Sequence, residues 1–251
     1  MSLLEISGVT KAFGGLLAVR EVSMSVEEGS IVAVIGPNGA GKTSLFNVVT
    51  GFDWPTSGTV RFDGEDIGGL EPWQVARRGM VRTFQTPVGF PALTVWENLM
   101  VAGTKPKDES LLAALIGSWK TAEKAVKGRA RQLLEDLGLW DSRQSIISDL
   151  PPGDVKLTDF ARQLMFEPRM LLLDEPASGV DPSAIGRLAD LIRRVRDQGV
   201  TVLVIDHNIG FVLDIADVVH VMALGEVIAS GPPEEIVHNE NVIEIYLGRP
   251  R

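Results

Sequence analysis

One short stretch of this sequence has the residue types and spacing suited to binding phosphate groups. It is Gly36-Pro37-Asn38-Gly39-Ala40-Gly41-Lys42-Thr43, the pattern of a phosphate-binding loop. Glycines let the backbone turn its N–H groups inward and leave room for phosphate oxygens. Lys42 supplies a charge for the β- and γ-phosphates, and the Thr43 hydroxyl suits Mg²⁺. We therefore predict a nucleoside triphosphate site, with Ser44 among its binding residues; the alternative is a glycine-rich turn with a surface lysine.

Two acidic residues follow an apolar stretch much further along the chain. Residues 170–173 are all apolar and lead directly into Asp174 and Glu175. A buried strand ending here would bring the Asp174 carboxylate to the Mg²⁺ shell, and Glu175 could polarise a water that attacks the γ-phosphate. A strand that merely ends at a charged turn is common, but the upstream loop makes that the minority interpretation.

Two more polar side chains stand at or just after the ends of expected strands. Gln85 follows residues 80–84, and His207 comes two residues after 200–205. If both stretches are strands of one α/β sheet, Gln85 can reach the bound ligand, and His207 can bond the γ-phosphate or orient the water. Without the phosphate loop, a solvated glutamine and a structural histidine would be preferred.

The elements that position these residues follow from the pattern of apolar residues. Stretches 30–35 and 200–205 are short, apolar and β-branched, as buried parallel strands are, and we expect them to be neighbours. Residues 43–49 can form a helix whose N-terminus places partial positive charge at the triphosphate. Together they form the strand, turn and helix that phosphate binding requires.

An antiparallel layer is predicted at the N-terminus. Residues 3–9 and 17–26 alternate apolar and polar positions, which indicates two half-buried strands. We expect Phe13 to lie in the turn between them. Its ring is free to stack on a base, or it closes the small β-layer, and the residue taken alone favours the second interpretation.

The rest of the chain alternates strands with helices, apart from one region. Residues 86 to about 165 show helical spacing and no convincing strand. The predicted fold class is α/β, with a core over residues 1–85 and 166–251 and a helical subdomain over 86–165. Other expected elements are a strand and turn over 59–67, helices over 72–79, 94–102, 109–119, 121–137 and 183–196, a hairpin over 218–229 and a helical tail over 233–247.

Composition and charge limit the classes of function. The chain has 251 residues, a hydrophobic content of 45% and a charged content of 23%, which suits a globular α/β protein. A net charge of −9 argues against a nucleic-acid groove as the main surface. The absence of cysteine excludes a disulfide framework. No apolar run reaches the roughly 18–20 residues that span a bilayer, and no signal peptide is visible. We expect any work at a membrane to require docking onto a protein that spans it.

Taken together, these motifs resemble the ATP-binding subunit of an ABC transporter, over the whole chain. The resemblance implies a RecA-like P-loop NTPase core that binds ATP and Mg²⁺. Gly36 to Thr43 matches the Walker A loop, and Leu171 to Glu175 matches Walker B with its catalytic glutamate. Phe13 matches the aromatic residue that stacks on adenine. His207 matches the switch histidine.

Two further motifs complete the resemblance. Gln85 matches the Q-loop glutamine, and Ser178-Gly179-Val180-Asp181 matches the D-loop. The resemblance implies that Thr43, Gln85 and Asp174 serve the metal, and that Glu175, His207 and Gln85 serve catalysis.

Finer features resemble the subfamily that serves importers of branched-chain and other hydrophobic amino acids, or of urea and amides. They are Val81-Arg82-Thr83-Phe84-Gln85, the helical link after Asn98-Leu99, and the ending Ile245-Tyr246-Leu247-Gly248. The resemblance implies two ATPase subunits at the cytoplasmic face of the membrane, with permease subunits as partners, a solute-binding protein as an indirect partner, and no nucleic acid. Thr86 to Leu99 would line the groove that receives a coupling helix.

One motif departs from the family pattern. The signature, usually Leu-Ser-Gly-Gly-Gln, is here Leu150-Pro151-Pro152-Gly153-Asp154. The prolines remove a hydroxyl and two N–H donors, and Asp154 brings negative charge toward the triphosphate of the opposite subunit. Prolines and an aspartate also start a helix well. We predict an asymmetric heterodimer whose partner has an intact signature.

Three other functions remain open at this point. ATPases of lipid or lipopolysaccharide export have similar cores. A soluble ABC ATPase acting on DNA or ribosomes usually needs coiled-coil inserts or tandem domains, which this chain lacks. A subunit that senses ATP with little hydrolysis would fit the altered signature but not the intact Glu175 and His207.

Overall fold

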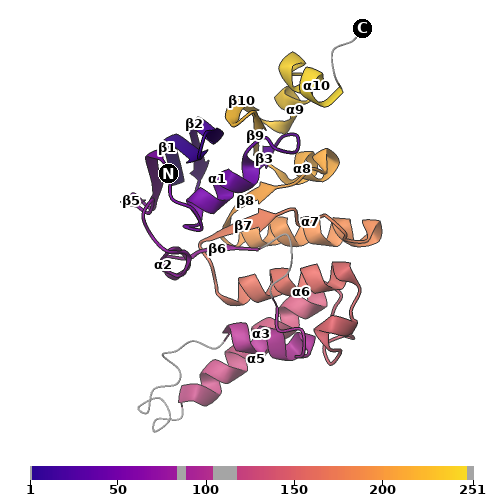
Figure 1. The fold of residues 1–251 in the computed structure, drawn as a ribbon. Coiled ribbons are helices and arrows are strands. Elements are labelled where there is room, and N and C mark those ends of the chain that lie inside the picture. Colours follow the sequence, from indigo (N-terminus) through magenta and orange to yellow (C-terminus); the bar gives the residue numbers. More distant parts are fainter. Residues whose placement is uncertain (1, 84–88, 104–117, 248–251) are drawn as a thin grey trace. The chain divides into compact units, whose positions relative to one another are not determined.

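The computed structural model describes residues 2–83, 89–103 and 118–247. Two compact units can be distinguished. The core unit comprises Met1–Arg82, Arg169–Ser178 and Ile192–Arg251, and the helical unit comprises Thr83–Pro168 and Gly179–Leu191. Figure 1 shows the elements of each unit.

The core unit contains two sheets. The first is antiparallel and has the strand order β2-β1-β4-β5. Its strands are β1 (Ser2–Phe13), β2 (Leu16–Glu27), β4 (Ser57–Phe62) and β5 (Glu65–Asp66). The long antiparallel pair β1–β2 confirms the predicted N-terminal layer.

The second sheet has the order β10-β9-β3-β8-β7-β6 and is parallel except for the antiparallel edge strand β10. All five side chains of both β3 and β8 are buried, because a central parallel strand is covered on both faces. The two strands are neighbours, as predicted. The strands are β3 (Ile31–Ile35), β6 (Met80–Arg82), β7 (Met170–Asp174), β8 (Thr201–Ile205), β9 (Val218–Ala223) and β10 (Glu226–Gly231).

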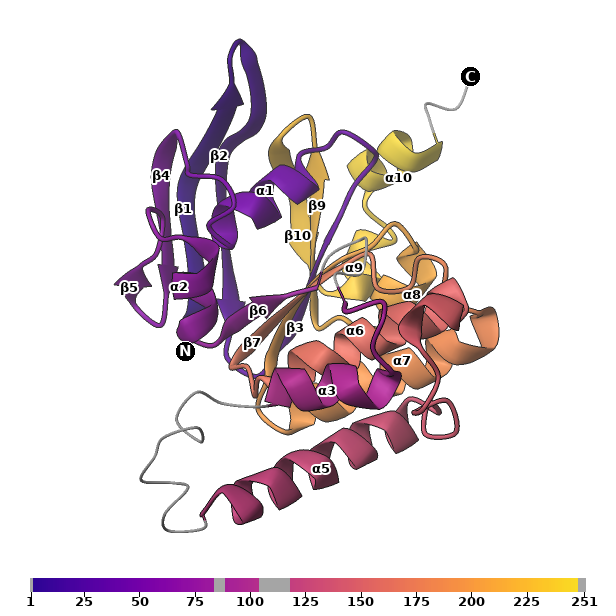
Figure 2. The same cartoon turned by 60° about the horizontal axis from the view of Figure 1, so that its bottom comes forward.

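A single apolar core joins the two sheets. Helix α1 (Lys42–Val49) lies between them (Figure 2). Its buried Leu45 and Phe46 belong to the same apolar cluster as Val9 of the antiparallel sheet and Val34 of the parallel sheet. The helix that starts at the phosphate loop is therefore fixed from both sides. The other helices of this unit are α2 (Pro72–Arg77), α8 (Ile209–Ile215), α9 (Pro233–Ile236), α10 (Glu240–Leu247) and the second part of α7 (Pro182–Asp197).

The helical unit is built from packed helices. Helices α3 (Val95–Gly103), α5 (Ser118–Asp136) and α6 (Pro152–Met165) contact one another, and a 3-10 turn, η2 (Ile147–Asp149), precedes α6. Thr94 and Glu97 form a capping box at the start of α3, in which the Glu97 carboxylate accepts from the Thr94 N–H and the Glu97 N–H donates to the Thr94 hydroxyl. This reciprocal pair satisfies two N–H groups at the helix start.

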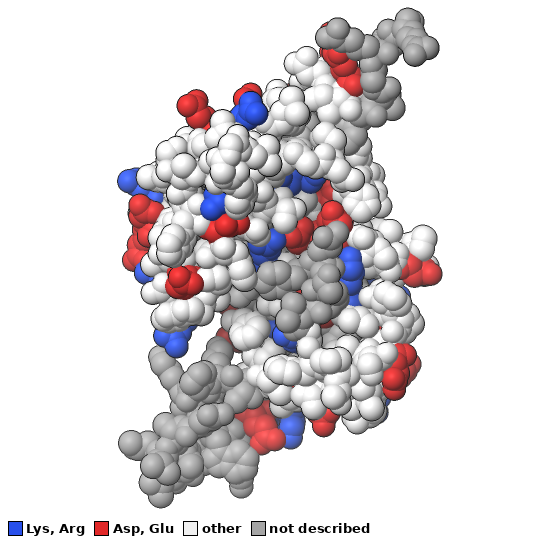
Figure 3. Space-filling model, viewed as in Figure 1, with Lys and Arg blue, Asp and Glu red and all other residues white. Residues whose placement is uncertain are grey.

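The observed architecture confirms the predicted α/β fold class with its antiparallel layer and helical portion. None of the described helices is both long and apolar enough to cross a bilayer. On the face drawn in Figure 3, Lys and Arg side chains of the described residues are interspersed with Asp and Glu. Most of the helix predicted over 109–119 lies outside the described residues.

Candidate functional site

The phosphate loop connects β3 to α1 within the core unit. Helix α1 begins at Lys42, and its N-cap, Gly41, makes no side-chain capping hydrogen bond. The N–H groups of the first turn are therefore available to an external acceptor. Gly41 has a φ of 98°, and a Cβ at this position would overlap the carbonyl oxygen of Ala18 on β2. Glycine alone allows both features.

Lys42 folds back over its own loop. Its Nζ donates to the carbonyl oxygens of Gly36 at 2.7 Å and Pro37 at 3.0 Å. Burial lowers the pKa of Lys42, and the charges of Glu175 and Asp174 oppose this effect. The loop and the acidic end of β7 therefore form one electrostatic site.

A cavity of about 380 Å³ opens over the loop. Its lining includes residues 38–44 of the loop and Glu175. Leu16, Leu17 and Leu224 add apolar surface, and Arg20 adds a cation. Sequence reasoning missed these four residues, although two adjacent leucines that follow Gly14 and Gly15 on a strand edge are an unusual exposed apolar pair.

The adenine-stacking prediction concerns Phe13. The predicted turn position is wrong, because Phe13 is the last residue of β1 and pairs with Leu16 of β2. The residue is 46% exposed, and Lys11 Nζ lies 4.8 Å from the ring centroid. Among the described residues that line the cavity, Leu16 and Leu17 appear and Phe13 does not. Stacking of a base on Phe13 stays a prediction.

Asp174 ends β7 and is held by an arginine that sequence reasoning gave no role. Its Oδ2 lies 2.7 Å from Nη2 of Arg82, and each side chain is 6% exposed. Arg82 is the last residue of β6 and lies opposite Leu172 in the β6–β7 register. The buried aspartate therefore carries a counter-ion from the neighbouring strand.

Glu175 occupies a backbone conformation that is rare for its residue type. Its φ is 49°, in the left-handed region that disfavours residues with a Cβ. Its N–H donates to the carbonyl oxygen of Ile205 at 2.7 Å, and its Oε2 lies 3.8 Å from Nδ1 of His207. Strain of this kind is found at functional positions. The structure thus brings Glu175, His207 and the phosphate loop together in the core unit.

A buried carboxylate beside His207 was also missed. Asp206 is fully buried, and it accepts from the N–H of Ala177 at 3.0 Å and from the N–H of Asn208 at 2.8 Å. It therefore joins the backbone after Glu175 to the backbone after His207. An acid directly after a buried strand is the same signal that indicated Asp174, and it could have been used.

The remaining predicted residues have different outcomes. Gln85 lies outside the described residues. In the D-loop, Asp181 accepts a hydrogen bond from the Ser183 N–H at 2.8 Å, close to the start of α7. Hydrogen bonds from Ser183 lower the pKa of Asp181. Of the other D-loop residues, Ser178 donates its N–H to the Glu175 carbonyl at 3.2 Å, and Val180 is buried.

The altered signature begins helix α6 in the helical unit. Pro151 is the N-cap without a side-chain hydrogen bond, Pro152 is the first helical residue, and Asp154 lies in the first turn. A Cβ on Gly153 would lie 3.2 Å from the carbonyl oxygen of Gly179, so the glycine packs closely on the D-loop backbone. The prediction that these residues start a helix is confirmed.

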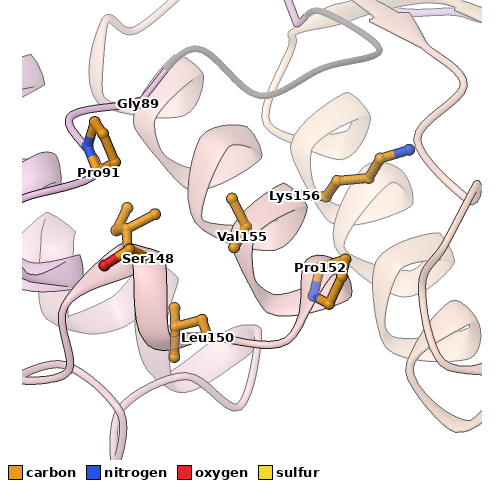
Figure 4. A pocket seen from close by; sticks show the side chains of 8 residues that line it. Gly89, Pro91, Ser148, Leu150, Pro152, Val155 and Lys156 are labelled. Atoms are coloured by element: carbon orange, nitrogen blue, oxygen red, sulfur yellow. The ribbon is translucent and has the colours of Figure 1, made fainter.

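A second cavity, of about 420 Å³, lies beside this helix start. We term it the helical-unit cavity. Figure 4 shows Leu150 and Val155 bordering it, while Lys156 extends away. Its lining is mainly apolar and consists of Gly89, Pro91, Ile147, Ser148, Leu150, Pro152, Val155 and Lys156.

Comparison with known proteins agrees with this geometry. Residues 19–178 match the family model described as ABC transporter. This chain belongs to the ABC transporter family. It is the ATP-binding, ATP-hydrolysing subunit of such a transporter. Residues 226–250 match a second model, described as branched-chain amino acid ATP-binding cassette transporter.

Individual relatives match over nearly the whole cassette. The high-affinity branched-chain amino acid transport ATP-binding protein BraF of Pseudomonas aeruginosa is 42% identical over 249 residues, which are 98% of each chain. The probable LivG protein of Archaeoglobus fulgidus is 38% identical over 99% of this chain and 96% of its own. A solved nucleotide-free ATP-binding cassette from an ABC transporter has a TM-score of 0.84 at 35% identity, covering 99% of this chain and 100% of its own. These names do not favour the lipid exporter or the soluble ATPase.

The residues present suit both ATP and Mg²⁺. The uncapped helix start and Lys42 suit phosphate groups, and positions 36 and 41 have no room for a side chain. Thr43 and Asp174 offer the oxygen donors that Mg²⁺ prefers. Within the described ranges, no three His, Cys, Asp or Glu residues gather as a metal site. A site in which Thr43 and Asp174 supply the protein donors suits an ion that completes its shell with substrate phosphates and water.

Proposed function

We propose that this ABC cassette hydrolyses Mg²⁺-ATP to drive import of branched-chain or other hydrophobic amino acids. The observation that carries the ATPase part is the shared cavity of the phosphate loop and Glu175. The substrate class is supported by the names of the relatives and by the match at residues 226–250. We place the chain at the cytoplasmic face of a membrane, bound to permease subunits. Residues 1–251 would act as one ABC ATPase domain, made of the core unit and the helical unit.

Each site residue has a proposed role. The N–H groups of residues 38–44 and the Lys42 ammonium bind the phosphates. Glu175 accepts a proton from the attacking water, and His207 orients that water or bonds the γ-phosphate. Phe13, together with Leu16 and Leu17, contacts the adenine.

The metal side of the site is proposed from the donor set. Thr43, Asp174 and Gln85 would hold Mg²⁺, which supplies charge neutralisation at the β- and γ-phosphate oxygens. The chain's own contribution is to fix Thr43 at a helix start and Asp174 at a strand end, which are rigid elements. Gln85 would couple this site to movement of the helical unit.

Transport assays with the assembled complex test the function. We expect ATP hydrolysis in proteoliposomes to rise when leucine, isoleucine or valine is supplied with the cognate solute-binding protein. Glu175→Gln should lower kcat by about 10²–10⁴-fold, whereas Glu65→Gln, in an exposed ion pair with Arg78, should not. Hydrolysis that responds to lipid and not to any amino acid would contradict the importer assignment and support an exporter.

The helical-unit cavity is the proposed contact with the permease. Gly89 and Pro91 belong to the stretch expected to line the coupling groove, and they also line this mainly apolar cavity. An apolar segment of a permease loop would bury surface there. Val155→Asp should uncouple hydrolysis from uptake and weaken copurification with the permease, whereas Val237→Asp, at a partly exposed position in the core unit, should do neither. Retention of permease binding by Val155→Asp would remove this contact from the proposal.

We further propose that the cassette works as one half of an asymmetric dimer. Its α6 start lacks a hydroxyl cap, has no N–H at Pro152, and carries Asp154 in its first turn. Each feature weakens binding of a partner's γ-phosphate. ATP on this chain's own loop would instead be hydrolysed against an intact partner signature.

Restoring the usual signature chemistry tests the asymmetry. Pro151→Ser combined with Asp154→Gln should raise ATPase activity of the assembled complex by about twofold if a second, silent site becomes active. Helix α9 offers a matched control, since it also starts with two prolines and has Glu235 in its first turn. Pro232→Ser with Glu235→Gln should leave the rate unchanged. An unchanged rate in the signature variant would refute the asymmetric dimer.

A further inference from the structure

We propose that Arg82 is the positioning residue for the Asp174 carboxylate, and thereby sets the Mg²⁺ dependence of nucleotide binding. This inference rests on the proposed role of Asp174 at the metal. It concerns a buried ion pair on two neighbouring strands, 2.7 Å between Nη2 and Oδ2. Arg82 itself has no proposed contact with nucleotide or metal.

The guanidinium of Arg82 is fixed by several acceptors. Nη1 donates to Oδ1 of Asn47 at 2.8 Å and to Oγ1 of Thr50 at 3.2 Å, while Nη2 donates to Asp174. Asn47 belongs to α1, and Thr50 follows its last residue. One planar fork therefore connects the phosphate-loop helix to the end of β7. A lysine has no such fork and cannot reach these acceptors in the same geometry.

Aromatic rings enclose the same group. The guanidinium carbon lies 5.6 Å from the ring centroid of Phe46 and 5.9 Å from that of Phe52. Contacts at these distances favour a cation and limit its movement. The arginine thus lies near two aromatic rings as well as being bound at its nitrogens, and both kinds of contact limit movement of the group that binds the carboxylate.

Stability alone does not account for this ion pair. Apolar replacements of buried ion pairs are often neutral or stabilising, because desolvation of both charges is costly. A role in orienting a functional carboxylate does account for it. Outer-shell partners of metal ligands typically change metal affinity by about 10–100-fold when they are removed.

The sign of the Mg²⁺ effect separates positioning from simple charge balance. If Arg82 only offsets charge, its removal leaves a more negative site, which attracts Mg²⁺ more strongly. If Arg82 positions Asp174, its removal weakens the Mg²⁺ response. Arg82→Lys keeps the charge and loses the planar fork. Positioning therefore predicts a weaker Mg²⁺ response than in the wild type, whereas charge balance predicts an unchanged response.

The experiment measures affinity of the full-length chain for a fluorescent ATP analogue over a Mg²⁺ titration, with an EDTA reference. Arg82→Met and Arg82→Lys should each raise the Mg²⁺ concentration at half-effect by about 10-fold or more, with EDTA affinity unchanged. Asn47→Ala removes one hydrogen-bond acceptor of the guanidinium. It should raise the Mg²⁺ concentration at half-effect too, but by less. Arg78→Met, in an exposed pair with Glu65, is the matched control and should match the wild type.

Each other outcome has a definite meaning. A normal Mg²⁺ titration in both Arg82 variants, or a stronger response in Arg82→Met, overturns the positioning role. If the Arg82 variants do not fold, an unshifted Asn47→Ala titration overturns it instead. A wild-type protein whose nucleotide affinity does not depend on Mg²⁺ would refute the proposed metal site, and is distinguishable because it needs no variant.

Discussion

Protonation of His220 provides a sharp test of the core-unit packing. His220 lies on β9, opposite Val34 of β3 and Ser230 of β10. It is 7% exposed, and neither ring nitrogen has a hydrogen-bond partner among the described residues. Burial lowers its pKa below the ordinary value of 6.5. We expect the free energy of unfolding to decrease when the pH falls below that value.

The sign and size follow from proton linkage. Well above pH 6.5 His220 is neutral in both states and contributes no pH dependence. Below it the unfolded chain takes up a proton that the folded chain does not, so the free energy of unfolding drops by about 1.4 kcal/mol per pH unit, until the lowered folded pKa is reached. Between pH 7.5 and 5.5 this contribution amounts to as much as about 1.4 kcal/mol.

The substitution His220→Leu removes this linkage while filling a similar volume. At pH 7.5 we expect it to raise the free energy of unfolding by about 1–3 kcal/mol, because two buried, unbonded nitrogens are removed. Urea unfolding, followed by both circular dichroism and tryptophan fluorescence to check two-state behaviour, gives the free energy at each pH. Other ionisable groups can add to the pH dependence of the wild type, so the difference between wild type and variant is the quantity that isolates His220.

A neighbouring residue of the same strand is the control. Val221 of β9 is fully buried and carries no ionisable group, so Val221→Ala should lower the free energy of unfolding and keep the wild-type pH slope. Parallel curves for wild type and His220→Leu from pH 7.5 to 5.5 would refute the reasoning, since they would mean that the folded state binds the proton as readily as the unfolded chain.

Three further predictions concern residues that hold the backbone of the phosphate site and of the helical unit. Asp206→Asn keeps the side-chain shape but places an amide NH₂ against the N–H of either Ala177 or Asn208. The kcat should fall about tenfold while the KM for ATP stays within about twofold; equal changes in kcat and KM would point to general loss of folded protein. In the helical unit, Asn98 is fully buried; its side chain accepts from the Phe90 N–H and donates to the carbonyls of Phe90 and Thr94. Asn98→Ala should therefore lower the free energy of unfolding by about 2–4 kcal/mol, whereas Asn241→Ala, at an exposed position, should change it little. Gly41→Ala forces a Cβ into the Ala18 carbonyl and should abolish ATP binding or folding. Gly128→Ala should keep both, because a Cβ there meets no atom of the described residues within 4 Å; normal affinity in Gly41→Ala would show that the loop is not so confined.

The main features of the fold could be predicted because the signals are local. Continuous apolar runs such as residues 31–35 and 202–205, a glycine-rich loop and a following helix can each be recognised from adjacent residues. Their relative order could also be anticipated, since strands of an α/β sheet deliver their C-terminal side chains to one edge. The positions of Glu175 and His207 near each other follow from that rule.

Other features depend on register and could not be predicted from spacing. Arg82 meets Asp174 because β6 and β7 pair with Arg82 opposite Leu172, and no local pattern gives that alignment. Leu16 and Leu17 line the cavity because β2 passes beside the phosphate loop, which depends on contacts between two sheets. The strand predicted over 80–84 is found as β6 over Met80–Arg82, and beyond residue 83 the prediction lies outside the described chain.

The left-handed backbone of Glu175 has a consequence for engineering this cassette. A non-glycine residue in such a conformation carries about 1–3 kcal/mol of unfavourable energy, which the hydrogen bond to Ile205 must hold in place. The substitution Glu175→Gly would release that energy and would also remove the proton acceptor. The Glu175→Gly variant is therefore expected to melt at a higher temperature than the wild type, which would make it the better starting material for trapping the transporter with ATP bound.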